Sequence, residues 1–143
     1  MIKLVPFVDV CVAQSAQFAD WIAEHTDDID QPATVFVAIR ESDGKTIGVI
    51  LLRHKLSEQW QDIGGHLAYI VAEDERGKGY ATEMLRLALG KCAELGMRQV
   101  YITCRRENVA SARAIIKNGG VLEKELEYKG MTLQRYNVQT KSY

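Results

Sequence analysis

The sequence has few cysteines, few prolines and no long apolar run, and each shortage excludes a class of protein. Its three cysteines, Cys11, Cys92 and Cys104, are too few and too widely spaced for a disulfide scaffold or a zinc site. No apolar stretch approaches the about 20 residues that a membrane-spanning helix needs, and the N-terminus lacks the basic and apolar regions of a signal peptide. We therefore expect a reduced, cytoplasmic protein with no metal ion and no membrane partner.

The chain also lacks an excess of either charge. Eighteen Lys and Arg residues stand against 19 acidic residues, and the net charge of −1 gives no positive field that would attract nucleic acid. The hydrophobic share of 47% and the charged share of 26% are ordinary for a soluble globular protein. Since no linker, repeat or low-complexity segment interrupts the 143 residues, the sequence predicts one domain over 1–143.

What the chain does contain is a regular succession of apolar patterns. Runs rich in β-branched and aromatic residues predict strands at 2–5, 34–40, 46–53, about 65–71, 99–104, 121–128 and 131–137. Turn signals at Asp43-Gly44 and Lys129-Gly130 predict two hairpins. Strands that alternate with helices in the middle and form hairpins on either side indicate an α/β (α+β mixed) fold, with a central mixed sheet covered by helices.

Helical spacing of apolar residues predicts three helices. The first spans 9–25, and the last runs from an N-cap at Asn108 to about Lys117. The long middle helix follows a polar, glycine-rich segment and ends at Gly96, a suitable C-terminal cap. Its expected buried stripe consists of Ala81, Leu85, Ala88, Cys92 and Leu95.

Two glycine features resemble nucleotide loops only in part. Gly44-Lys45-Thr46 ends like a Walker loop, but Ile39 stands where that motif needs glycine, and the segment lies in a hairpin turn. The segment 77–82 begins like a dinucleotide fingerprint but ends on Thr82, and polar residues separate it from the preceding strand. A dinucleotide-binding protein is therefore disfavoured.

A better interpretation takes the same segment as Arg76-x-x-Gly79-x-Ala81 between a strand and a long helix. Glycines let backbone N–H groups converge on an anion, and the following helix adds the positive end of its dipole. A pyrophosphate would suit this arrangement. A glycine-rich turn with solvated charges explains the residues equally well.

The segment 69–85 resembles the acetyl-CoA-binding motif of the GNAT N-acetyltransferase superfamily, whose signature Arg/Gln-x-x-Gly-x-Gly/Ala is matched by Arg76, Gly79 and Ala81. The strand at 100–104 and the Asn-x-x-Ser at 108–111 follow in the order and spacing of ribosomal-protein-type members, and uncharacterised bacterial members are similar too. The resemblance implies a largely antiparallel sheet of six to seven strands, splayed between about 65–71 and 99–104 and flanked by three to four helices.

The resemblance also implies acetyl-CoA as co-substrate. The pantetheine arm would pair with the backbone of 70–72, backbone amides of the glycine segment would hold the pyrophosphate, and Asn108 and Ser111 would serve the pantetheine and thiol end. The implied cofactor-binding residues are Ile70, Val71, Ala72, Arg76, Gly77, Lys78, Gly79, Tyr80, Ala81, Thr82, Asn108 and Ser111. A plain helix cap at Asn108 and a solvated hydroxyl at Ser111 are the alternatives.

In this family an amine attacks the thioester directly in a ternary complex, helped by a base. Members often place Glu on the strand before the motif, and His66 matches that position. A neutral imidazole can accept a proton at pH 7, although the side chain could instead point to the opposite face. Ile115 stands where many members have the tyrosine acid. Tyr69 is the nearest candidate for that role, although a tyrosine on a central strand is more often a core residue.

Other polar residues carry weaker signals. For Cys104, a small buried residue is favoured over a nucleophile. For Arg53 and His54, solvated residues at the end of a strand are favoured over part of an acceptor site. The acidic stretch 27–30 could attract a cationic amine but is more simply a solvated charge run.

The first third of the chain is the other departure from the family. The segment 6–33 is short for the two helices that usually wall the acceptor site. The acceptor groove is therefore expected to be more open, or completed by a second subunit of a homodimer.

The first expectation is an N-acetyltransferase that transfers an acetyl group from acetyl-CoA to a primary amine of a small molecule or peptide. The alternative is a non-catalytic module that binds or senses acyl-CoA on the same fold, because both the usual glutamate and the usual tyrosine are missing.

Overall fold

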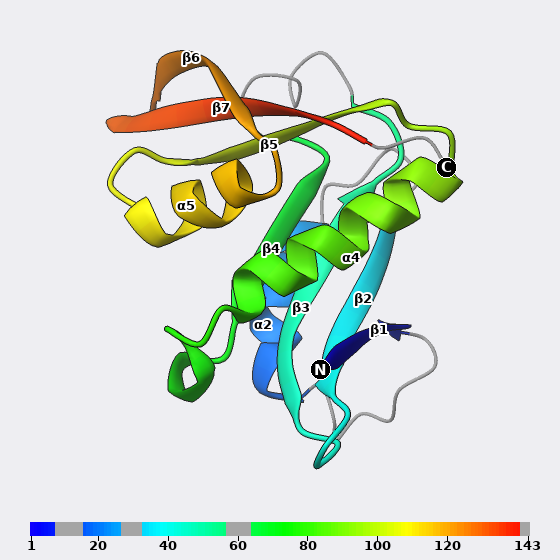
Figure 1. Ribbon diagram of the computed structural model, residues 1–143. Coiled ribbons are helices and arrows are strands. Elements are labelled where there is room, and N and C mark those ends of the chain that lie inside the picture. Colours follow the sequence, from blue (N-terminus) through cyan, green and yellow to red (C-terminus); the bar gives the residue numbers. More distant parts are fainter. Residues whose placement is uncertain (8–15, 27–32, 57–63, 141–143) are drawn as a thin grey trace.

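The computed structural model describes residues 1–7, 16–26, 33–56 and 64–140, and their strands form two antiparallel sheets (Figure 1). The first sheet has the order β1-β2-β3-β4, with β1 (Ile2–Pro6), β2 (Ala33–Arg40), β3 (Thr46–Arg53) and β4 (Leu67–Val71). The second has the order β5-β7-β6, with β5 (Gln99–Arg105), β6 (Val121–Tyr128) and β7 (Met131–Gln139). All seven expected strands and both hairpins are confirmed.

Three α-helices and two short 3-10 turns complete the described part. They are η2 (Ala16–Phe18), α2 (Ala19–Thr26), η3 (Glu73–Glu75), α4 (Tyr80–Glu94) and α5 (Val109–Lys117). Gly96, with φ of 79°, follows α4 as predicted, and Asn108 caps α5. Of the helix expected over 9–25, the described residues contain η2 and most of α2, while 8–15 lie outside them. None of the helices described is both long and apolar enough to cross a membrane.

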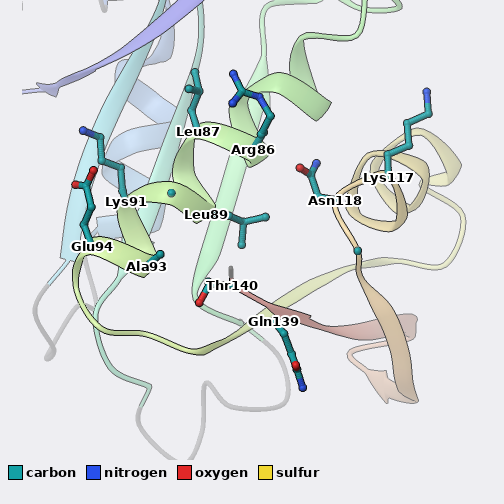
Figure 2. Close-up of a pocket in the computed structure, with 12 residues that line it drawn as sticks. Arg86, Leu87, Leu89, Lys91, Ala93, Glu94, Lys117, Asn118, Gln139 and Thr140 are labelled. Carbon is teal, nitrogen blue, oxygen red and sulfur yellow. The ribbon is translucent and has the colours of Figure 1, made fainter. Parts of the chain in front are cut away.

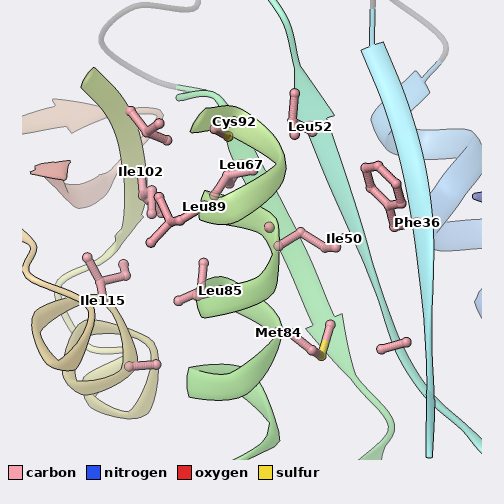
Figure 3. Packing of buried hydrophobic residues seen from close by; sticks show 14 of the residues in the cluster. Phe36, Ile50, Leu52, Leu67, Met84, Leu85, Leu89, Cys92, Ile102 and Ile115 are labelled. Atoms are coloured by element: carbon pink, nitrogen blue, oxygen red, sulfur yellow. The ribbon is translucent and has the colours of Figure 1, made fainter. Parts of the chain in front are cut away.

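The main core surrounds α4, which lies between the first sheet and α5 (Figure 3). Met84 points toward the first sheet, whereas Leu85 points toward Ile115 of α5, and all three side chains are fully buried. Complete burial of a side chain of this size stabilises the fold by about 1.5–3 kcal/mol. The predicted stripe holds for most of its length, but Leu95 is 54% exposed because the helix ends at Glu94 and Leu95 is its C-cap.

The two sheets separate between β4 and β5, as the predicted splay requires. Within the described residues β4 and β5 share no ladder and are linked by a single bridge, from Gly65 to Ile102. Figure 1 shows the two strands close together where β4 begins and apart where it ends. The open edge of β4 therefore faces α5 and the start of α4, and the candidate site lies there.

Candidate functional site

A cavity of about 690 Å³, which we call the β4–α5 cavity, lies between β4, the segment after it, the start of α4 and α5. Most of the site residues expected from the sequence line it: Tyr69, Ile70, Val71, Arg76, Gly77, Gly79, Tyr80, Ala81, Thr82, Asn108 and Ser111. Three do not, namely His66, Ala72 and Lys78. The structure thus brings together two segments that are about 30 positions apart in the chain.

One end of the cavity is built by residues 76–81, which we call the glycine turn. Gly79 is the N-cap of α4 at φ of 85°, and no side chain caps the helix there. The first helical bond of α4 runs from the Glu83 N–H to the Gly79 carbonyl, so the amides of the first turn lack helical acceptors. No atom lies within 4 Å of a Cβ built on Gly77 or Gly79. These amides and the helix dipole together suit an anionic group.

The two cations of the glycine turn are both held by neighbouring groups. Arg76 Nε donates to the Val71 carbonyl at 3.1 Å, which ties the arginine to the end of β4 while it lines the cavity. Lys78 Nζ lies 2.8 Å from Glu75 Oε1. Lys78 is therefore directed toward the protein and contributes less positive charge to the cavity than the sequence alone suggests.

Glu75 is the centre of an ion-pair cluster behind the glycine turn. Its side chain is only 3% exposed, and besides Lys78 it accepts from Arg40 at 2.9 Å and Lys45 at 2.7 Å. Hydrogen bonds from Lys45, Lys78 and Arg40 lower the pKa of Glu75 to about 2. The cluster fastens the glycine turn to the β2–β3 hairpin. Sequence reasoning missed Glu75, because nothing in the acidic run 73–75 shows which carboxylate is buried.

The open edge of β4 offers backbone groups at alternate residues only. The Ala72 N–H donates to the Ile47 carbonyl at 2.8 Å, so the backbone of Ala72 faces β3. Because backbone groups alternate along a strand, Tyr69 and Val71 face the open edge instead. Of the residues 70–72 that were expected to pair with a pantetheine arm, Val71 has the right direction, and its N–H is the available group because its carbonyl already accepts from Arg76. The backbones of Ile70 and Ala72 face β3, which corrects the expectation for these two residues.

Tyr69 and Ser111 meet across the opening between β4 and α5. Their hydroxyl groups form a short hydrogen bond. Burial raises the pKa of Tyr69 to about 12, although its bond to Ser111 acts in the opposite direction. Cys104 lies beside this pair, and burial raises the pKa of its thiol, which argues against a thiolate nucleophile. Ile115, which replaces the family's tyrosine, is fully buried in the core and does not line the cavity.

Asn108 serves as the helix cap and also lines the cavity. Its Oδ1 accepts a hydrogen bond from the Ser111 N–H at 3.2 Å. Within the described part, its Nδ2 makes no hydrogen bond. The two interpretations left open by the sequence are therefore compatible, because the oxygen caps α5 while the amide nitrogen stays available to a ligand.

His66 lies outside the β4–α5 cavity. Its Nδ1 accepts a hydrogen bond from the Tyr101 N–H at 2.9 Å, so the proton of the neutral ring is on Nε2. Burial lowers the pKa of His66 to about 4, with help from Arg135 and Arg53. An imidazole with an occupied acceptor and a low pKa is a poor base at pH 7. The general-base role stays an untested prediction, and this geometry speaks against it.

The structure adds cavity residues that the sequence did not single out. Trp21 of α2 lines the wall near Ile70, and its ring stacks on His25 at 4.0 Å between centroids. Arg113 and Lys117 line the opposite wall from successive turns of α5. Their i, i+4 spacing after Asn108 was the available signal, since such a pair shares one helix face.

The weaker candidates do not join the site. Arg53 is buried and donates to the Gly65 carbonyl at 2.9 Å, while His54 Nε2 lies 2.8 Å from Thr34 Oγ1. Neither lines the β4–α5 cavity. The acidic stretch 27–30 and most of the loop 55–62 lie outside the described residues.

A second cavity of about 760 Å³ lies toward the C-terminal ends of α4 and α5 (Figure 2). It is lined by the later turns of α4, the end of α5 and the end of β7, including Arg86, Lys91, Lys117 and Thr140. None of the expected site residues lines it. The larger volume of this second cavity therefore does not make it the better candidate, because the backbone amides of the glycine turn and the Tyr69–Ser111 pair lie at the β4–α5 cavity.

Comparisons with known proteins show the family and the fold. The family model described as an acetyltransferase (GNAT) domain matches residues 5–121. No curated protein matches the chain in sequence.

Similar solved structures include a spermidine/spermine N-acetyltransferase from Vibrio cholerae, with TM-score 0.70 and 16% identity over 98% of this chain and 95% of that one. A ribosomal-protein-S5-alanine acetyltransferase from Vibrio fischeri has TM-score 0.63 and 15% identity, over 87% and 69%. A GNAT-family acetyltransferase from Bacillus anthracis has TM-score 0.61 and 21% identity, over 74% and 66%. At these identities the structures show the fold that they share with this chain.

Proposed function

Because the chain belongs to the GNAT acetyltransferase family, we propose that it transfers the acetyl group of acetyl-CoA to a primary amine, and that the β4–α5 cavity binds the acetyl-CoA. The observation that carries this proposal is the pairing of an uncapped helix N-terminus with a part-buried tyrosine–serine pair along one open strand edge. The first suits a diphosphate and the second a reacting thioester.

Different residues of the cavity would bind different parts of acetyl-CoA. The amides of the glycine turn would hold the diphosphate, and the N–H of Val71, which faces the open edge of β4, would donate to the pantetheine arm. Asn108 Nδ2 would donate to a pantetheine carbonyl, since that amide nitrogen is uncommitted within the described part. Arg113 and Lys117 would face the remaining phosphate from α5.

The chemistry needs little from the protein beyond positioning. Acetyl-CoA supplies an acetyl thioester, at which a neutral amine forms the new C–N bond while the C–S bond breaks, the amine loses a proton and the sulfur becomes a thiol. Tyr69 would donate a hydrogen bond toward the sulfur, where negative charge develops. Its raised pKa keeps the hydroxyl protonated at every physiological pH. Ser111 orients that hydroxyl.

The test is binding and turnover measured separately. Calorimetry should show that acetyl-CoA binds at least about tenfold more tightly than acetyl-pantetheine, a difference of about 1.4 kcal/mol. Free-thiol release should appear for at least one member of a panel of polyamines, amino acids, aminoglycosides, lysine and peptide N-termini. Equal affinity for the two thioesters would contradict the glycine turn as the diphosphate site. Tight binding with no thiol release on any amine would support the acyl-CoA sensor instead.

A further inference from the structure

The place where the two sheets join is built from four residues, which we call the sheet joint: Gly65, His66, Tyr101 and Ile102. Among the described residues, Gly65, just before β4, and Ile102 of β5 form the one bridge between the two sheets. Gly65 has φ of 69°, and a Cβ there would lie 2.7 Å from the Tyr101 carbonyl oxygen, so only glycine fits this close approach. Beyond the joint the strands diverge, and the β4–α5 cavity opens between them.

The backbone of His66 is bonded to both sheets at once. Its N–H donates to the Tyr101 carbonyl at 2.6 Å, on the side of the second sheet. Its carbonyl accepts from the Arg53 N–H at 2.7 Å, on the side of the first sheet. In a regular strand both groups of one residue point to the same neighbour. The turn at Gly65 has therefore left the Tyr101 N–H without a backbone carbonyl from His66.

The side chain of His66 occupies the place of that missing carbonyl. Its Nδ1 accepts the Tyr101 N–H at 2.9 Å, and the two rings stack at 5.6 Å between centroids with an interplanar angle of 14°. The Arg135 guanidinium carbon lies 3.9 Å from the centroid of the Tyr101 ring, and Arg53 donates to the Gly65 carbonyl. The low pKa of His66 fits this arrangement, because a protonated Nδ1 could not accept.

We propose that His66 is a positioning residue whose imidazole completes the hydrogen-bonded joint between the two sheets and so fixes the opening in which acetyl-CoA binds. The pairing at the joint stands on its own geometry, and the effect on acetyl-CoA rests on the proposed function. This role replaces proton transfer as the reason for a histidine at this position. The positioning role requires a hydrogen-bond acceptor two bonds beyond Cβ, and it requires no change in the protonation state of the side chain.

Two substitutions of His66 distinguish the positioning role from proton transfer. In His66→Asn, Oδ1 stands the same number of bonds from the backbone as Nδ1 and accepts without titrating. In His66→Leu, a side chain branched at the same carbon has no acceptor. We expect the Tyr101 amide to exchange its hydrogen at a similar rate in the wild type and His66→Asn, and at least about tenfold faster in His66→Leu.

The functional measurements should follow the same division. His66→Asn should keep the wild-type kcat, acetyl-CoA affinity and pH profile, whereas His66→Leu should bind acetyl-CoA at least about tenfold more weakly. A tenfold loss of kcat in His66→Asn with a protected Tyr101 amide would overturn the proposal in favour of proton transfer. Unchanged exchange in His66→Leu, or faster exchange with unchanged acetyl-CoA affinity, would overturn it as well.

A measurement on the wild type keeps the proposal testable if His66→Leu does not fold. Nitrogen-15 NMR should show the His66 ring in the Nε2–H tautomer throughout the range from about pH 5 to pH 9, with Nδ1 bonded to the Tyr101 amide. An Nδ1–H tautomer, or titration near the usual pKa of about 6.5, would contradict the joint. If the wild type binds no acetyl-CoA, the proposed function fails, while hydrogen exchange and NMR still decide the joint.

Discussion

Lys78 Nζ lies 2.8 Å from Glu75 Oε1, so the lysine of the glycine turn is paired with a carboxylate three residues earlier in the chain. That carboxylate is buried. The same carboxylate receives Arg40 and Lys45 from the β2–β3 hairpin. One buried carboxylate therefore pairs with three cations at the point where the turn meets the first sheet. Two of these cations also have an exposed partner, since Arg40 pairs with Asp43 and Lys45 pairs with Asp74, each at 2.7 Å. Removal of its charge takes this partner from Lys78 and leaves Arg40 and Lys45 paired with exposed carboxylates alone.

Glu75→Gln is expected to lower stability at neutral pH and to flatten its dependence on acid. The pKa of Glu75 is about 2 in the folded protein, below its usual value of 4.5. A lowered carboxyl pKa stabilises the fold above the unfolded-state value, and this contribution is lost as the pH falls from about 4.5 toward 2. Thermal unfolding from pH 7 to pH 3 should thus show a steeper loss in the wild type than in Glu75→Gln.

The matched control is Glu73→Gln, which changes an exposed acid of the same 3-10 turn. It should leave the acid limb of the stability curve as in the wild type. Asp43 and Asp74, whose pKa values are also lowered, contribute to the limb in all three proteins. If stability falls with pH equally steeply in the wild type and in Glu75→Gln, then the charge of Glu75 does not contribute to the stability of the fold.

Gly79→Ala is expected to weaken acetyl-CoA binding by at least about tenfold, or about 1.4 kcal/mol. Gly79 has φ of 85°, and alanine would shift the backbone that presents the first amides of α4. Gly44→Ala is the control, since Gly44 has φ of 73° in the β2–β3 turn and, like Gly79, has open space around its Cβ position. Both variants should lose similar stability, and calorimetry should find weaker acetyl-CoA binding for Gly79→Ala alone.

The sequence predicted most of the fold because its signals are local. The hairpin turns, the Asn108 cap and the apolar stripe of α4 depend on neighbouring residues, and the structure confirms them, except that Leu95 at the end of the stripe is exposed. The glycine turn was found for the same reason. Its motif specifies backbone conformation and the start of a helix within a few residues.

What the sequence could not predict depends on residues distant in the chain. The direction of the His66 ring is set by Tyr101, 35 positions away, through a joint that requires Gly65 to turn. The burial of Glu75 depends on Arg40 and Lys45, which another hairpin supplies. In both cases the residue type was visible in the sequence, and its partner was not.

Asn108→Asp is expected to separate the two roles of Asn108. Aspartate caps a helix as well as asparagine does, so the bond from the Ser111 N–H and the melting temperature should be retained. The carboxylate lacks the Nδ2 donor, and acetyl-CoA affinity or turnover should fall at least about threefold. Asn108→Ala should lose both functions, with about 1 kcal/mol of stability from the cap. Unchanged activity in a well-folded Asn108→Asp protein would leave only the cap.

Tyr69→Phe is expected to lower kcat at least about tenfold, or about 1.4 kcal/mol in the barrier, with little change in acetyl-CoA affinity. The ring remains packed on β4 while the hydroxyl that would face the sulfur is removed, so the loss should fall on kcat and not on binding. Ser111→Ala keeps that hydroxyl but removes its partner and should have a smaller effect on kcat.

Because the pKa of Tyr69 is about 12, the hydroxyl stays protonated up to about pH 11. Ionisation of Tyr69 should therefore not lower the wild-type rate below pH 10. The pH profiles of the wild type and Tyr69→Phe should have the same shape up to that pH. A wild-type kcat in Tyr69→Phe would remove the hydroxyl from the reaction and leave Tyr69 as a core residue that supports Ser111.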